Sequence, residues 1–384
     1  MSRVLLLCLL LWAQGVAAAG DSYTLRVYDE RLQRGIDLIY GLRFAEADQY
    51  FGQIIAAEPE NPVGHFFLAM VTWWRVLVDL EDRSHDQAFY GLLEKCIQVC
   101  DRRLEQSPND FDAVLCKGGA TGFRGRLRGD RHQFLQAASD GLKCLPLLDL
   151  IRQLEPTNKD VLFGRGIYNY FVEVMPERYP IVKPIVWLME KGDRQLGLQQ
   201  LQQVAEEGYY ARAEAAYFLA QIYRVFERDK DRALEYLEQL HARYPDNSLF
   251  HRYTARTLID LGQWDRGTAL YREVARRSAE GRPGYHLRGQ LEALFFLGKD
   301  AFRRNRLDEA IEAFAAVDSL GGRLGEELDR HYVALANLLM GMCFDLQGQR
   351  AEAVRCYERV QKRPDYNTHD LAAKYLKTPY GTVP

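Results

Sequence analysis

The sequence predicts an all-α protein, an α-solenoid of about eight stacked helix pairs that wind into a right-handed superhelix. Two observations predict this fold. The first is a set of prolines, each followed two residues later by Asn or Asp and ten residues later by Ala or Gly: Pro59, Pro108, Pro156 and Pro245. Proline ends one helix, Asn or Asp caps the next, and a small residue permits close helix packing. Each proline therefore marks the start of a new helix pair.

The second observation is an Ala followed four positions later by a large apolar residue. The pairs are Ala47 with Phe51, Ala233 with Leu237, Ala310 with Phe314, and Ala353 with Tyr357. Ala47 and Phe51 also precede Pro59 at the spacing typical of tetratricopeptide repeats. The chain resembles that family over nearly all of its length after the first 19 residues. The resemblance implies a solenoid that binds partners in a groove and carries no catalytic residue.

Composition and charge give no indication of nucleic-acid binding. The 384 residues are 47% hydrophobic and 27% charged, with a net charge of −3. This composition supplies a large core, and the mild acidity gives no general attraction to phosphate backbones. We predict no nucleic-acid partner.

The first 19 residues resemble a secretory signal. Arg3 is a minimal charged region, Val4–Trp12 is apolar, and Ala17–Ala19 provide a small-residue cleavage site before Gly20. The alternative is an uncleaved membrane anchor, but the apolar run is well short of the roughly 20 residues that a membrane span needs. We therefore predict cleavage near Ala19 and a periplasmic or secreted protein.

The repeat boundaries divide the chain into five parts. They are a signal peptide (1–19), N-terminal repeats (20–158), a central repeat with a proline-rich apolar insert (159–213), C-terminal repeats (214–363), and a capping helix and tail (364–384).

The central insert is predicted to interrupt the stack. Its prolines are Pro176, Pro180 and Pro184. Because proline breaks a helix, we expect Val172–Lys191 to stay outside the regular packing. Asp193 should cap a helix that begins at Arg194 and runs to about Glu207, with Gly208 closing it.

The insert also contains an apolar run that includes Ile185, Trp187 and Met189. A patch of this length is too apolar to be left exposed without a purpose. It is expected to lie across the groove as a lid, against a partner, or on a membrane surface.

A narrower resemblance covers roughly residues 158–247. It rests on Gly166-x-Tyr168-Asn169-Tyr170, on Met175-Pro176, and on Gly192-Asp193-Arg194-x2-Gly197-Leu198. These motifs resemble exported bacterial tetratricopeptide proteins that are related to a mitochondrial outer-membrane family. Where such proteins carry Gly-Phe before Gly-Asp-Arg, this chain has Met189-Glu190-Lys191. The resemblance implies no catalytic residue.

Counting from the repeat starts predicts which side chains line the groove. The predicted lining is aromatic in the N-terminal half and charged in the C-terminal half: Phe66, Met70, Trp73, Trp74, Phe123, Phe163, Tyr170, Phe171, Arg252 and Arg256, with Asp260, Lys299 and Arg303 at equivalent positions. Such a groove suits an apolar peptide or helix. The alternative is that the aromatic side chains are core residues packed against the insert.

Six cysteines follow the signal region. Cys96 and Cys144 occupy helix-packing positions and are expected to be buried thiols. Two pairs flank predicted helix turns and are disulfide candidates in an oxidising compartment: Cys100 with Cys116, and Cys343 with Cys356. A zinc site is the alternative, but close Cys-x2-Cys pairs are missing.

No sequence motif marks an active site, a cofactor or a metal. We therefore predict a non-enzymatic exported scaffold that binds a protein or peptide segment in its groove, in an envelope-associated assembly. The alternative is a module that binds a membrane surface or an amphiphile through the central insert. Catalysis is the least favoured reading.

Overall fold

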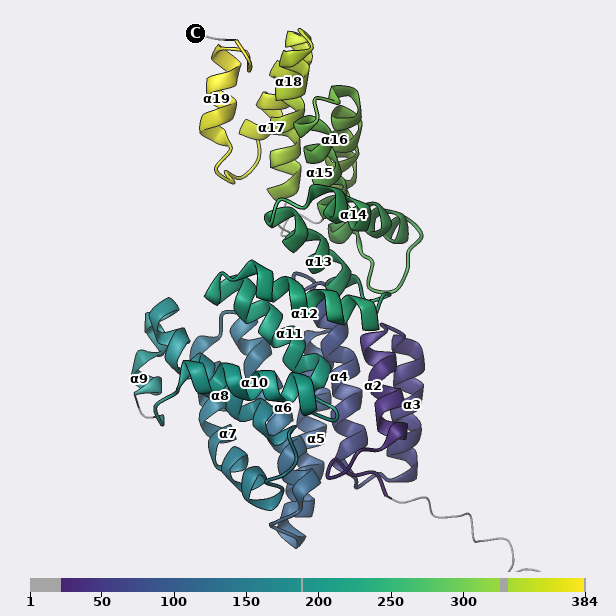
Figure 1. Ribbon diagram of the computed structural model, residues 1–384, viewed down its shortest axis with the longest axis vertical. Coiled ribbons are helices and arrows are strands. Elements are labelled where there is room, and N and C mark those ends of the chain that lie inside the picture. The colour runs from purple at the N-terminus through teal and green to yellow at the C-terminus, as the bar shows by residue number, and fades with distance from the viewer. Residues whose placement is uncertain (1–21, 188, 325–330, 383–384) are drawn as a thin grey trace, which may run out of the picture.

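A computed structural model describes residues 22–187, 189–324 and 331–382, and no strand occurs among them. The predicted all-α solenoid is confirmed (Figure 1). The helix pairs are α2 (Glu30–Tyr40) with α3 (Phe44–Ala57), α4 (Pro62–Val78) with α5 (Asp86–Gln106), α6 (Phe111–Asp130) with α7 (Phe134–Leu154), α8 (Val161–Arg178) with α10 (Arg194–Glu207), α11 (Arg212–Ile222) with α12 (Lys230–Arg243), α13 (Ser248–Asp260) with α14 (Trp264–Ala279), α15 (Leu287–Arg303) with α16 (Leu307–Gly321), and α17 (His331–Leu346) with α18 (Arg350–Gln361). The short elements are η1 (Pro180–Val182), α9 (Lys183–Val186), η2 (Tyr223–Glu227) and a last helix, α19 (His369–Lys377).

The predicted helix caps are formed at three of the four boundaries. Asn61, Asp110 and Asn247 each accept a backbone N–H from the first turn of the helix that follows. The cap predicted at Asn158 is wrong, because its side-chain oxygen accepts from Asp160 N, which precedes α8. The Asn158 amide instead binds another part of the chain.

Small residues allow the two helices of a pair to approach closely, as predicted. A Cβ added at Gly341 would lie 2.5 Å from a ring carbon of Tyr357. At the equivalent position of the preceding pair, a Cβ on Gly298 would lie 2.7 Å from the ring of Phe314. Contacts this short cannot form without a shift of the ring or the helix, so glycine is required at both positions.

The N-terminal half closes on itself, because its first helix pair contacts segments beyond α10. The Tyr40 hydroxyl donates to Glu214 at 2.9 Å, and Asn247 donates its amide to the Tyr40 carbonyl at 2.9 Å. Tyr244 donates to Asp37 at 2.9 Å. One continuous hydrophobic core consequently runs from the first helix pair to α13.

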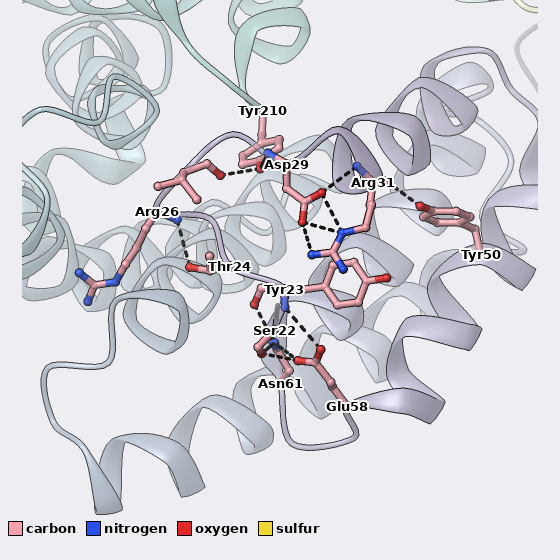
Figure 2. A network of polar contacts seen from close by, with 11 residues as sticks. Ser22, Tyr23, Thr24, Arg26, Asp29, Arg31, Tyr50, Glu58, Asn61 and Tyr210 are labelled. Atoms are coloured by element: carbon pink, nitrogen blue, oxygen red, sulfur yellow. Dashed lines mark hydrogen bonds and ion pairs between the residues drawn. The ribbon is translucent and has the colours of Figure 1, made fainter. Parts of the chain in front are cut away.

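Residues 22–29, here called the N-terminal strap, run along the helix-pair boundaries in Figure 2. Asn61 donates to the Tyr23 carbonyl at 2.8 Å, and Asn158 donates to the Leu25 carbonyl at 3.0 Å. Tyr210 donates to the Val27 carbonyl at 2.8 Å. These side chains bind backbone atoms, so the strap links several pairs of the N-terminal half.

Helices α13–α19 form an arm that rises from this body (Figure 1). The C-terminal end of α4 holds the base of the arm. His286 Nε2 lies 2.7 Å from the Val78 carbonyl oxygen, and Arg288 Nε donates to Asp79 at 3.3 Å. A second hydrophobic core continues along the arm to Cys356.

The interruption at the insert begins later than predicted. Helix α8 continues through Pro176 to Arg178, and regular packing stops at Tyr179. Pro176 lies in the last turn of α8, where the helix can accept a proline at the cost of one backbone hydrogen bond. The expected resumption is confirmed, because Asp193 accepts from Leu196 N at 2.9 Å at the start of α10.

Candidate functional site

The most prominent predicted groove residues lie in the core. Trp73 is 0% exposed and Trp74 is 1% exposed. The Trp74 ring lies 4.9 Å from that of Tyr40 and 5.4 Å from that of Phe250, centroid to centroid. These contacts come from opposite sides of the closed N-terminal half. The prediction that both tryptophans line an open groove is therefore wrong.

The other aromatic candidates surround the same interior. Tyr170 and Met70 are buried, which contradicts the groove prediction, and four side chains are half-buried: Phe66, Phe123, Phe163 and Phe171. The rings of Phe163 and Phe218 meet edge to face at 5.5 Å. The N-terminal half therefore uses its aromatic residues for internal packing.

A carboxylic acid lies among these rings. Glu214 is buried and accepts from Tyr40, and the indoles of Trp73 and Trp74 lie near its carboxylate. Burial raises the pKa of Glu214 to about 7, although Tyr40 and Arg126 oppose this shift. The group carries a proton under mildly acidic conditions, and it belongs to the core.

Arg252 and Arg256, both predicted groove residues, belong to an internal ionic network. Arg256 donates to Glu292 at 3.1 Å, and Arg252 lies 3.7 Å from the same carboxylate. Burial opposes ionisation of Glu292, but the two arginines hold its pKa below its ordinary value. Arg252 is buried, so its assignment to an open groove is wrong. Arg256 remains half-buried at the edge of the network.

The first helices of the arm present two rows of equivalent residues. The first row lies one position after the small packing residue of each repeat and consists of Arg256, Lys299 and Met342. The second row lies five positions after that residue and consists of Asp260, Arg303 and Leu346. Lys299, Arg303 and Leu346 are exposed, Leu346 to 44%. Because α13, α15 and α17 lie in succession, these rows run along one face. We call this set of six residues the arm face.

An aromatic ring supports the charged centre of the arm face. The guanidinium carbon of Arg303 lies 5.1 Å from the Trp264 ring centroid, and Lys299 Nζ lies 5.9 Å from it. Arg303 also donates to Asp300 at 2.9 Å. No acidic partner of Lys299 occurs among the described residues. The counting that placed Lys299 and Arg303 missed Trp264, because Trp264 begins the second helix of its pair.

The insert does not cover the aromatic interior. It packs on α7 and α8 at the edge of the body (Figure 1), where Trp187 is 86% exposed and Ile181 is 59% exposed. Met189 is half-buried, and the side chain of Ile185 lies outside the described residues. A lid resting on Trp73 and Trp74 is therefore excluded.

The six cysteines within the described residues are all buried free thiols. Cys96 and Cys144 pack between helices as predicted, but the predicted Cys100–Cys116 and Cys343–Cys356 disulfides are not formed. The Cys96 thiol instead donates to the Pro62 carbonyl of the neighbouring helix α4 at 4.0 Å. Distance from a turn does not determine the rotation of each helix, which decides where a thiol points.

Within the described residues, no group of three or more His, Cys, Asp or Glu side chains is arranged to hold a metal ion. Across the same part of the chain, no helix combines the length and the apolar character required to cross a bilayer.

Comparison with known proteins agrees with this architecture. A tetratricopeptide-repeat model matches residues 224–283 and 254–322, and a second such model matches residues 335–366. No curated protein sequence matches the chain significantly.

Three solved structures illustrate what the chain is similar to. The human IFIT1 dimer with PPP-AAAA is 14% identical in sequence, and the match has a TM-score of 0.46. The alignment covers 84% of this chain and 69% of the IFIT1 chain. The Rap protein complexed with competence and sporulation factor is 14% identical, with coverages of 91% and 96% and a TM-score of 0.44. A tetratricopeptide repeat protein from Parabacteroides merdae is 13% identical, with coverages of 80% and 97% and a TM-score of 0.34.

The repeat models match η2 and α12 at the end of the body and the helix pairs of the arm, and the other helices of the body also stack in pairs. Residues 224–322 and 335–366 are tetratricopeptide repeats.

Proposed function

We propose that the chain is an exported, non-enzymatic scaffold, and that the arm face binds a segment of a partner protein. The exposed pair Lys299 and Arg303 on the Trp264 ring is the observation that carries the proposal. Cations held over an aromatic ring can attract a carboxylate while the ring packs against apolar groups. Export is supported only by the sequence of Met1–Ala19, which lies outside the described residues.

The centre of the arm face and its α17 end differ in character, which defines the partner segment. Lys299 and Arg303 on α15 are basic, whereas Met342 and Leu346 on α17 are apolar. A segment that carries acidic residues beside apolar ones would match the basic centre and the apolar α17 end at once. Buried Asp300 keeps Arg304 at 2.9 Å and Arg306 at 3.6 Å, so the surface charge of Arg303 can be changed without leaving that acid unpaired.

Charge reversal on the arm face tests the proposal. The chain would be panned against a displayed random-peptide library, and the enriched peptides would then be measured by calorimetry. We expect the double variant Lys299→Glu with Arg303→Glu to bind these peptides at least tenfold more weakly, a loss of about 1.4 kcal/mol of binding free energy. The reason is that the attraction between two basic side chains and an acidic peptide becomes a repulsion. Higher salt should weaken binding to the unmodified chain.

Arg272→Glu is the matched control, since Arg272 is an exposed basic residue on the second helix α14. Binding that falls equally in the control and in the double variant would contradict the proposal. A failure of panning to enrich acidic and apolar residues together would also contradict it.

A second candidate function is attachment of the insert to a membrane surface. The high exposure of Trp187 and Ile181 favours it. Tryptophan is preferred at the boundary between lipid headgroups and acyl chains, and the exposed Lys183 and Lys191 flank the tip with positive charge.

Vesicle binding tests this second candidate. With phosphatidylcholine and phosphatidylserine vesicles, Trp187→Ala is expected to lower the co-sedimented fraction several-fold, because it removes the main apolar contact. Leu371→Ala, which removes an exposed apolar side chain of α19, should leave that fraction unchanged. If the unmodified chain stays in the supernatant, the insert does not attach the protein to membranes.

A further inference from the structure

Two adjoining cavities lie where α2 meets the loop between α10 and α11 and the end of α12. We call this junction the seam. The first cavity, of about 190 Å³, is lined largely by aromatic and basic residues: Tyr28, Gln33, Ile36, Gly208, Tyr209, Tyr210, Arg212, Ala213, Arg243 and Tyr244. The second, of about 270 Å³, shares Arg243 and Tyr244 with the first. Neither cavity belongs to the arm face.

The aromatic walls of the first cavity come from both sides of the seam. The Tyr28 and Tyr210 rings are nearly parallel, with an interplanar angle of 14° and centroids 6.3 Å apart. Tyr209 approaches Tyr28 at 6.1 Å. Such surfaces favour a flat apolar group. A cavity of about 150 Å³ is enough to hold benzene, so the first cavity has room for a phenyl ring.

The walls are held in place before any ligand arrives. Asp160 accepts the backbone N–H groups of Tyr209 and Tyr210, both at 2.9 Å. The Tyr210 hydroxyl donates to the Val27 carbonyl at 2.8 Å. The same hydroxyl accepts from Asp29 N at 2.7 Å, as Figure 2 shows. Preorganised walls lower the entropic cost of binding.

The charge of the seam selects the polar part of the ligand. Arg212 is exposed and forms no hydrogen bond or ion pair with the described residues, although its positive charge opposes the rise that burial causes in the pKa of nearby Asp160. Arg243 lies 3.7 Å from Asp37, whose oxygen also accepts from Tyr244. Cages of aromatic rings commonly hold cations, but two arginines at this one would repel them. An anionic ligand is therefore favoured.

We propose that the seam binds an aryl carboxylate, with the ring among the tyrosines and the carboxylate paired with Arg212. Arginine suits this role because its planar donors match a carboxylate. Two sources share the chemistry: a free aryl acid, and a polypeptide that ends in an aromatic residue. The site is independent of the proposed arm-face function.

Nuclear magnetic resonance titration with 3-phenylpropionate tests the proposal, with neutral 3-phenylpropanamide as the matched probe. We expect the amide to bind at least fivefold more weakly than the acid. We expect Arg212→Gln to weaken binding of the acid by a similar factor. Arg272→Gln is the control for a lost exposed arginine. The peptide Ala-Ala-Ala-Phe with a free carboxylate distinguishes the sources, since tighter binding than the acid indicates a chain terminus and weaker binding a free acid.

Equal affinities for acid and amide would overturn the proposal, as would equal affinities in Arg212→Gln and Arg272→Gln. Absence of binding by both probes would overturn it as well. The arm-face double variant should bind the acid normally, so failure of the arm-face proposal and failure of this one can be told apart.

Discussion

Replacing Trp74 with alanine is expected to lower the free energy of unfolding by about 3–5 kcal/mol, the range found for buried aromatic truncations. The Trp74 ring contacts Tyr40, Tyr217 and Phe250, so its removal leaves a cavity between α2, α11 and α13. Urea unfolding followed by circular dichroism measures the change. We expect the midpoint to fall without a large change in slope.

Trp187→Ala is the matched control, because it removes the same side chain from a highly exposed position. Surface substitutions of this kind usually change stability by no more than about 0.5 kcal/mol. Equal stability of the two variants would mean that Trp74 lies in an open groove, as the sequence suggested, and that the N-terminal half is not closed.

The helix pairs could be predicted because their signals are local. Asn61 and Asp110 cap the helix that follows them, and Gly341 receives the ring of Tyr357 fifteen or so residues further along the chain. The course of the superhelix is not local. Small rotations between successive helix pairs accumulate until α2 meets α12 and α13. No short sequence motif encodes the total rotation.

This difference separates the predicted groove residues that are exposed from those that are buried. Lys299 and Arg303 were placed by counting within one repeat and are exposed on the arm. Trp73 and Trp74 were placed by the same counting, but the opposite wall of the closed body covers them. The seam escaped prediction because Tyr28 and Tyr210 belong to repeats that are far apart in sequence.

The polar role of Asn158 shows the same limit. Its position after Pro156 indicated a helix cap, yet its amide binds the carbonyl of Leu25 in the N-terminal strap. The chemistry of an asparagine side chain serves either use equally well. Only the path of a segment more than a hundred residues earlier decides between them.

Glu214 should make the stability of the folded chain depend on pH. The titratable groups that face it are Tyr40 from α2, Arg126 from α6 and Tyr217 from its own helix, and the indoles of Trp73 and Trp74 from α4, which do not titrate, also favour its charged form. Burial raises the pKa of both tyrosines. Burial opposes the charge of Arg126, but Asp130 holds its pKa above the ordinary value. None of these three neighbours changes its charge between pH 4.5 and pH 7, so Glu214 titrates alone within this set.

The direction follows from proton binding. The pKa of Glu214 is about 7 when folded, against an ordinary value of 4.5. Between these values the folded state holds a proton that the unfolded state has released, so stability falls as pH rises. The full effect over this range is about 3 kcal/mol, since each pKa unit corresponds to about 1.4 kcal/mol.

Glu214→Gln isolates this contribution, because glutamine keeps an oxygen that can accept from Tyr40 and does not titrate. We expect the difference in unfolding free energy between the variant and the unmodified chain to shift by about 3 kcal/mol in favour of the variant from pH 4.5 to pH 7. Other groups cancel in this difference, including His251 and His286, whose pKa values burial lowers to about 3 and about 4. Parallel stability curves for the two proteins would show that the pKa of Glu214 is the same in the folded and unfolded states, and that the junction of α2 with α11 admits water.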